Sequence, residues 1–141
     1  MLTDAFDIST QYVKPAALPE ASLHLNNSTG MISGFGATEN KETSENLLVA
    51  NITIFHDKKC KYDYNLIIES FNFCAGGIHG EDTCRGDSGG PLVIQRHGEW
   101  ILYGITSSGD DCKHITKPGL YTKVNAFLGD INNTIITEPG K

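Results

Sequence analysis

The apolar residues of this 141-residue chain occur in short runs, and the longest of these, 47–50 and 100–103, contain four residues each. A helix that crosses a membrane needs about 20 apolar residues in succession, so we expect no membrane segment. Glycines and other turn residues separate β-rich runs of strand length, at 30–36, 47–55, 91–95 and 100–106. The pattern predicts an all-β protein, an antiparallel barrel or sandwich, with a single domain.

Two local patterns extend this prediction. The residues 96–99 join two apolar runs as the connection of a β-hairpin would. Near the end of the chain, apolar residues recur at helical spacing around Asn125, a residue type that often caps helices: Val124, Phe127, Leu128, Ile131 and Ile135. We therefore expect one α-helix after the strands, at about 124–136.

The charge of the chain limits its partners. Seventeen Asp and Glu residues against eleven Lys and Arg residues give a net charge of -6. A phosphate backbone or an anionic membrane surface would be repelled by most of this surface. We therefore expect neither nucleic acid nor a membrane among the partners.

The cysteines point to an extracellular protein. There are four of them, an even number, and no pair has the C-x-x-C spacing typical of a zinc site. Disulfides are the better interpretation, and we expect no metal and no cofactor. Sequons of the form N-x-S/T at Asn26, Asn27, Asn51 and Asn132 fit the same compartment. The first residues do not resemble a secretory signal, which suggests that the beginning of the protein is missing.

The segment 81–91, Glu-Asp-Thr-Cys-Arg-Gly-Asp-Ser-Gly-Gly-Pro, carries the strongest chemical signal. A serine among glycines can present its Oγ on a tight turn while backbone N–H groups reach a developing oxyanion. An isolated Ser-Gly-Gly would be no more than a glycine-rich turn. The longer string Gly-Asp-Ser-Gly-Gly-Pro behind Cys84, however, resembles the nucleophile loop of the trypsin and chymotrypsin family of serine endopeptidases.

The resemblance covers essentially the whole chain, because further segments match the family in its order: 12–19, 32–36, 73–76, 104–107 and 117–124. It covers only the second half of the family's catalytic domain. It implies a link between two barrels at about 1–30, a second, six-stranded antiparallel β-barrel at about 31–123 and the terminal helix at about 124–136. On this resemblance we expect the family's N-terminal barrel to be absent from the sequence.

The resemblance assigns roles residue by residue. Ser88 matches the nucleophile, and the backbone N–H groups of Gly86 and Ser88 match the oxyanion hole. Asp82 matches the acid at the base of the specificity pocket, where it would pair with a substrate Lys or Arg side chain. The remaining substrate-binding matches are the backbone groups of Ser107 and Gly109, which would pair with an extended substrate, and the small pocket-wall residues Gly109 and Gly119.

The resemblance also implies structural roles. Cys60 should pair with Cys74, and Cys84 with Cys112; on the chain-entropy model loops of this length add about 3 to 4 kcal/mol each. Asp87 matches a carboxylate that is buried against the α-amino group made by zymogen cleavage. Because this chain supplies no such group, we expect the Asp87 loop to turn outward or to be disordered.

Two of the departures from the family pattern concern the specificity pocket. Ser108 stands where a Trp is common, which removes an apolar wall beside the substrate. Asp111 stands where a Gly is usual, and it could attract or obstruct a cationic side chain. Cleavage after Lys or Arg is the expectation that follows from Asp82.

A serine nucleophile needs a base and an acid that orients it, and in the family both come from the first barrel. None of the histidines lies in the family's Ala-Ala-His-Cys setting: His24, His56, His79, His97 and His114. We therefore expect a fragment of a secreted trypsin-like endopeptidase that is inactive alone. Its partners would be polypeptide substrates, the missing N-terminal barrel or a complementary chain, and protein inhibitors.

Two alternatives remain open from the sequence. One is a noncatalytic binding module that uses the half-barrel to hold a substrate, an inhibitor or a partner chain. The other is a chain whose second half is supplied as a separate polypeptide, which would restore the triad between two chains.

Overall fold

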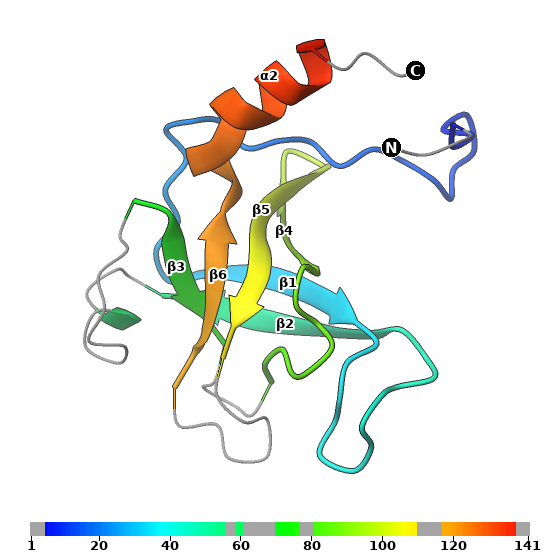
Figure 1. Ribbon diagram of the computed structural model, residues 1–141, viewed down its shortest axis with the longest axis vertical. Coiled ribbons are helices and arrows are strands. Elements are labelled where there is room, and N and C mark those ends of the chain that lie inside the picture. The colour runs from blue at the N-terminus through cyan, green and yellow to red at the C-terminus, as the bar shows by residue number, and fades with distance from the viewer. Residues whose placement is uncertain (1–4, 56–58, 61–69, 77–80, 110–116, 138–141) are drawn as a thin grey trace.

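The computed structural model describes residues 5–55, 59–60, 70–76, 81–109 and 117–137. Six strands form one antiparallel barrel that closes in the order β1-β2-β3-β6-β5-β4 (Figure 1). The strands are β1 (Ser28–Gly34), β2 (Leu48–Ile54), β3 (Asn72–Ala75), β4 (Pro91–Arg96), β5 (Glu99–Ser108) and β6 (Gly119–Lys123). The prediction of a six-stranded antiparallel barrel is confirmed.

The core of the barrel is built around an aromatic cluster. The Phe73 ring lies 5.0 Å from the Tyr103 ring and 5.4 Å from the Tyr121 ring, measured between centroids. Gly104 makes room for this cluster, since a Cβ at that position would lie 2.5 Å from the Phe73 ring. Aliphatic side chains from other strands complete the core, among them Ile32, Ile52, Ile54 and Leu92.

The turn between β4 and β5 is the expected hairpin. His97 and Gly98 both have positive φ, 52° and 84°. Two consecutive residues with positive φ are typical of the tight turns whose twist suits a β-hairpin. Further along β5, the register with β6 shifts between Thr106 and Ser108, which marks a β-bulge in this pair.

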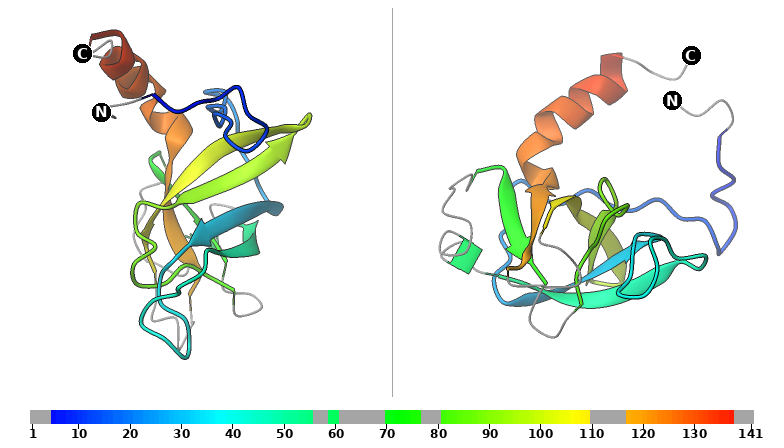
Figure 2. Two further views of the ribbon diagram at one scale, coloured as in Figure 1. Left: turned by 90° about the vertical axis from the view of Figure 1, so that its right-hand side faces the viewer. Right: turned by 60° about the horizontal axis from the view of Figure 1, so that its bottom comes forward.

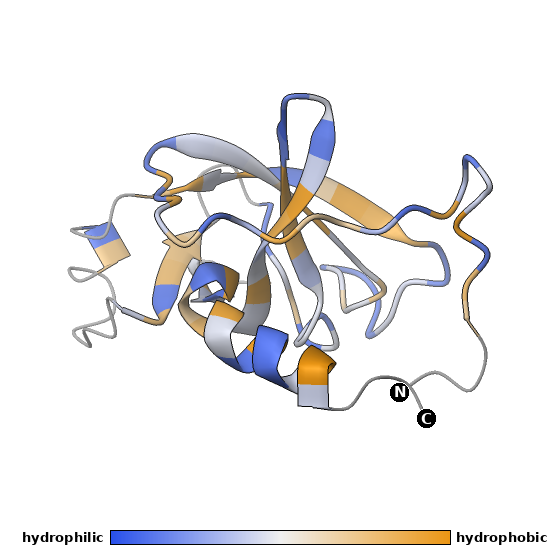
Figure 3. Ribbon diagram, turned by 90° about the horizontal axis from the view of Figure 1, so that it is seen from above, coloured by the Kyte–Doolittle hydropathy of each residue, from blue (hydrophilic) through white to orange (hydrophobic). Residues whose placement is uncertain are grey.

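The C-terminal helix has two parts, the 3₁₀-helix η1 (Val124–Phe127) and the α-helix α2 (Leu128–Thr137). Figure 2 shows α2 projecting away from the barrel, and none of its residues is buried. Seen from above, α2 carries both polar and apolar residues (Figure 3). No helix in the described ranges has the length and apolar character of a membrane span.

Asn125 does not cap the helix, contrary to the sequence prediction. It lies inside η1, and its amide donates hydrogen bonds to the backbone carbonyls of Ala21 and Leu23, at 3.3 and 2.9 Å. Its polar side chain therefore fastens the N-terminal link to the end of the barrel. The same link is held to β5 further upstream, where Ala17 N–H donates to the Trp100 carbonyl at 2.8 Å.

Candidate active site

The loop between β3 and β4 carries Ser88 on two successive tight turns. Asp87 N–H donates to the Cys84 carbonyl at 3.0 Å, and Gly90 N–H donates to the Asp87 carbonyl at 2.9 Å. Gly86 and Gly89 have φ of 95° and 83°, values that few other residues adopt. The glycines of the motif thus allow the chain to reverse twice, and Ser88 is exposed between the turns.

The loop leaves two backbone donors open. Within the described residues, the N–H groups of Gly86 and Ser88 donate to no carbonyl or side chain, whereas the neighbouring Gly89 N–H donates to the Thr106 carbonyl at 2.9 Å. Unpaired donors beside an exposed hydroxyl are what an oxyanion needs. Both groups belong to residues that the sequence assigned to this task.

Ser88 opens onto a cavity of about 340 Å³ that we call the Ser88 cavity. It is lined by Thr83, Cys84, Arg85, Ser88, Thr106, Ser107, Ser108 and Gly109. Two of the predicted substrate-binding residues, Ser107 and Gly109, therefore line the same cavity as Ser88. Thr106 and Ser108 of β5 pair with Tyr121 and Leu120 of β6, and the register shift between them leaves Ser107 without a pairing partner on β6.

Asp82 is held on the other side of this loop by backbone donors and a tyrosine. Its carboxylate accepts hydrogen bonds from Thr83 N–H at 2.8 Å, Gly119 N–H at 3.0 Å and the Tyr121 hydroxyl at 3.4 Å. Burial raises the pKa of Asp82 to about 6, against the opposing effect of these hydrogen bonds. Burial also raises the pKa of Tyr121. Asp82 is therefore ionised only above about pH 6.

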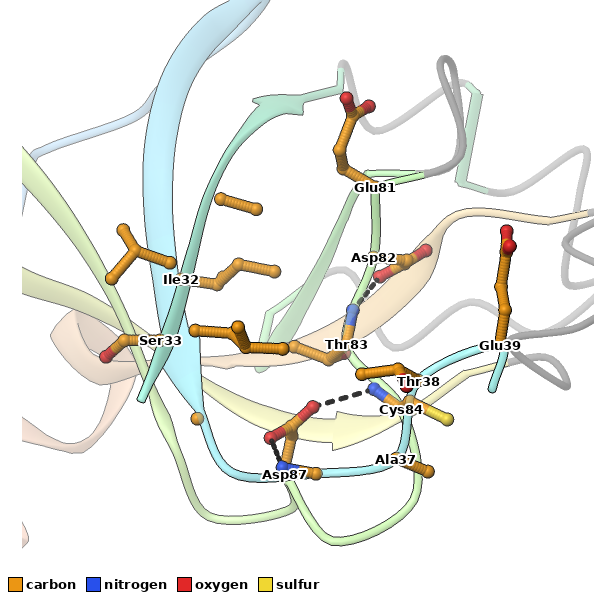
Figure 4. A pocket seen from close by; sticks show the side chains of 15 residues that line it. Ile32, Ser33, Ala37, Thr38, Glu39, Glu81, Asp82, Thr83, Cys84 and Asp87 are labelled. Atoms are coloured by element: carbon orange, nitrogen blue, oxygen red, sulfur yellow. Dashed lines mark hydrogen bonds between the residues drawn. The ribbon is translucent and has the colours of Figure 1, made fainter. Parts of the chain in front are cut away.

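A second cavity, of about 310 Å³, lies next to the first, and we call it the acidic cavity. Four carboxylates are among its lining residues, those of Glu39, Glu81, Asp82 and Asp87, and its walls include the apolar Ile32, Leu48 and Val49. Figure 4 shows Asp82 and Asp87 on the side of the cavity formed by Thr83 and Cys84. Thr83 and Cys84 line both cavities. In this structure, Asp82 thus borders the acidic cavity and not the Ser88 cavity.

Asp87 turns inward, so the expectation that its loop turns outward is wrong. Its carboxylate is half-buried and accepts hydrogen bonds from Gly36 N–H at 2.8 Å and from Cys84 N–H at 2.9 Å. Two backbone donors compensate a large part of the cost of burying this charge, a source of stabilisation that the sequence did not reveal. Gly36 is required for this contact, because a Cβ there would lie 2.5 Å from the carboxylate.

The cysteine prediction is confirmed for one bridge. Cys60 and Cys74 form a disulfide with a Cα–Cα distance of 5.6 Å. Cys112, the expected partner of Cys84, lies outside the described residues, as does Asp111. No cluster of three or more potential metal ligands occurs within the described ranges.

The described histidines lie away from Ser88. His24 is exposed in the N-terminal link, His97 is exposed in the β4–β5 turn, and neither lines the Ser88 cavity. His56, His79 and His114 lie outside the described residues. Two contributors were missed in the sequence: Tyr121, which contacts Asp82, and Arg85, which lines the Ser88 cavity. The position of Arg85 inside the nucleophile motif was the available signal.

Comparison with known proteins supports the resemblance. The sequence profile of the trypsin family matches residues 6–131. The chain is 36% identical over 129 residues to phenoloxidase-activating enzyme 1 of Spodoptera litura. The aligned residues make up 89% of this chain and 34% of that relative. It is 35% identical over 135 residues to the urokinase-type plasminogen activator of Gallus gallus. The aligned residues make up 91% of this chain and 31% of that relative.

The barrel, the exposed serine on its glycine turns and the matching profile are features of the trypsin-like serine protease family. The chain belongs to the trypsin family. It spans about a third of the length of the two relatives.

Proposed function

We propose that this chain is the nucleophile-bearing part of a secreted trypsin-like endopeptidase. The observation that carries the proposal is the exposed Ser88 beside the open N–H groups of Gly86 and Ser88. A base removes the Ser88 Oγ proton as Oγ attacks the carbonyl carbon of a peptide bond. The oxyanion accepts hydrogen bonds from the two N–H groups, the leaving amine takes the proton, and water then releases the acyl group.

The substrate is a polypeptide that is cleaved after Lys or Arg. Asp82 is the carboxylate that binds this cationic side chain. Its described hydrogen-bond partners, Thr83, Gly119 and Tyr121, include no lysine or arginine, and above about pH 6 its negative charge is available to a cation. In productive binding the cationic side chain passes Thr83 to reach Asp82, and the substrate backbone pairs with Ser107 and Gly109. Gly119 leaves the space that the carboxylate occupies, because a Cβ there would lie 2.6 Å from Asp82 Oδ1.

The base and the acid that orients it come from residues outside this chain. The described histidines His24 and His97 do not line the Ser88 cavity, and the relatives are about three times as long as this chain. The complementary partner is an N-terminal barrel, attached or supplied as a second chain. The 141 residues alone are inactive. Secretion is supported by the Cys60–Cys74 disulfide, a bond typical of oxidising compartments.

The proposal is tested by hydrolysis of Arg and Lys esters. We expect the isolated chain to be no faster than its Ser88→Ala variant, whereas the protein from its natural source should hydrolyse the esters in a Ser88-dependent manner. The assay must be sensitive, because an enzyme that lacks part of its triad can still accelerate the reaction about 10³ to 10⁴-fold over water through its oxyanion hole and substrate binding. Equal rates with Arg, Lys and neutral esters would contradict the role of Asp82.

A further inference from the structure

The pairing of β1 with β2 brings together two sequons that are far apart in the sequence. Asn27-Ser28-Thr29 leads into β1, and Asn51-Ile52-Thr53 lies within β2. The antiparallel register places Thr29 directly opposite Thr53. The two sequons therefore share one part of the barrel wall.

Both asparagines are exposed there. In β2 the side chains of Ile52 and Ile54 are buried, with 4% and 0% exposure, and they point into the barrel. Side chains alternate along a strand, so Asn51 points outward, and it is exposed. Asn27 is exposed in the turn before β1, where its φ of 50° places it outside the regular strand.

We propose that Asn27 and Asn51 carry N-linked glycans. In each case the asparagine Nδ2 attacks the anomeric carbon of an oligosaccharide carried on a lipid pyrophosphate. The new C–N bond replaces the anomeric C–O bond, the lipid pyrophosphate leaves with the electron pair, and the amide proton passes to a base of the transferase. The inference rests on the secretion part of the proposed function, because transfer takes place in the secretory pathway, but it does not depend on catalysis by Ser88.

The outer face of β1 and β2 can hold both glycans. Asn27 lies two residues before Thr29 and Asn51 lies two residues before Thr53, so in the antiparallel register they lie on either side of the Thr29–Thr53 pair. Asn51 lies opposite Met31, and Val49, two residues away on the same face of β2, is 57% exposed. A glycan on Asn51 would cover these apolar side chains, which are otherwise open to solvent.

The other two sequons differ in their surroundings. Asn26 adjoins Asn27, so a glycan on one leaves no room for a glycan on the other. Asn132 lies in α2 one helical turn after Leu128 and one turn before Ile136, within an apolar stripe of that helix. Neither Asn26 nor Asn132 belongs to the proposal, and both are replaced by glutamine in the background chain for the test.

The test uses this background chain with a secretory signal, produced in insect cells. Glycopeptide mass spectrometry and the mobility shift after peptide N-glycosidase F treatment are measured for secreted and cell-associated protein. We expect two glycans on the background chain, one after Asn27→Gln, one after Asn51→Gln and none in the double variant. Thr53→Ala should remove the Asn51 glycan and Thr53→Ser should retain it, which separates sequon recognition from the mere presence of the asparagine.

Entry into the secretory pathway is read from the same sample by the oxidised Cys60–Cys74 bridge. An unmodified Asn27 or Asn51 in chains that contain this bridge would overturn the proposal. Glycans found on both residues of a chain that shows no esterase activity with any partner would leave the proposal standing and contradict only the proposed function.

Discussion

The backbone N–H of Gly119 donates a hydrogen bond of 3.0 Å to the carboxylate of Asp82. This contact joins the first residue of β6 to the loop that carries Ser88. It also fixes where the Asp82 carboxylate lies, together with the hydrogen bond of 2.8 Å that this carboxylate accepts from Thr83 N–H. The position of Asp82, which lies in a loop, therefore depends on the backbone of a glycine in strand β6.

Replacement of Gly119 by alanine tests this dependence. The new Cβ would lie 2.6 Å from Asp82 Oδ1 and 3.2 Å from the Tyr121 ring, so the carboxylate must move. We expect a loss of about 1 to 3 kcal/mol in the free energy of unfolding, measured with urea. The control is Gly129→Ala in α2, where a Cβ has open space and we expect no loss. Equal effects of the two substitutions would contradict the role of Gly119.

The raised pKa of Asp82, about 6, predicts how stability depends on pH. Between its unfolded value, about 4, and 6, folded Asp82 keeps a proton that the unfolded chain has lost. Asp82 therefore costs no stability below about pH 4, and it destabilises the fold increasingly as the pH rises to 6. We expect Asp82→Asn to become more stable relative to the wild type across this interval, measured by urea unfolding at each pH. A difference that is constant between pH 4 and 7 would contradict the raised pKa.

Asp87 is predicted to stabilise the nucleophile loop through its two backbone donors. Asp87→Ala removes the acceptor of Gly36 N–H and Cys84 N–H, and we expect a loss of about 1 to 3 kcal/mol in the free energy of unfolding. Glu39→Ala is the matched control, since Glu39 borders the same cavity but is exposed. A loss for Glu39→Ala as large as that for Asp87→Ala would show that cavity charge matters and not these hydrogen bonds.

The barrel could be predicted from the sequence because its signals are local. The runs that became β1, β2, β4 and β5 alternate or are bounded by turn residues, and the turn at 96–99 has the spacing of a hairpin. The short strand β3 offers too few residues for a pattern, and the sequence singled out this region only as the segment 73–76 that matches the family. The spacing of apolar residues likewise located the C-terminal helix. It could not separate the 3₁₀-helix η1 from the α-helix α2, since over a single turn both helix types place residues three positions apart on nearly the same face.

The sequence proposes residues for the site but does not indicate their contacts. The motif proposes roles for Ser88, Gly86 and Asp82, yet nothing local indicates that Asp87 meets Gly36, which is distant in the sequence. Asn125 was misread for the same reason, because its partners Ala21 and Leu23 belong to the other end of the chain. Contacts of this kind depend on how the barrel closes, and the sequence pattern of one segment does not contain them.

The most direct test of the account is covalent labelling of Ser88 by a fluorophosphonate, located by peptide mapping. We expect a label on Ser88 in the protein from its natural source, where residues outside this chain supply the base. We expect no label above the Ser88→Ala control in the isolated chain of 141 residues. A natural protein that cleaves Arg or Lys esters without a label on Ser88, or an isolated chain labelled as fast as the natural protein, would contradict it.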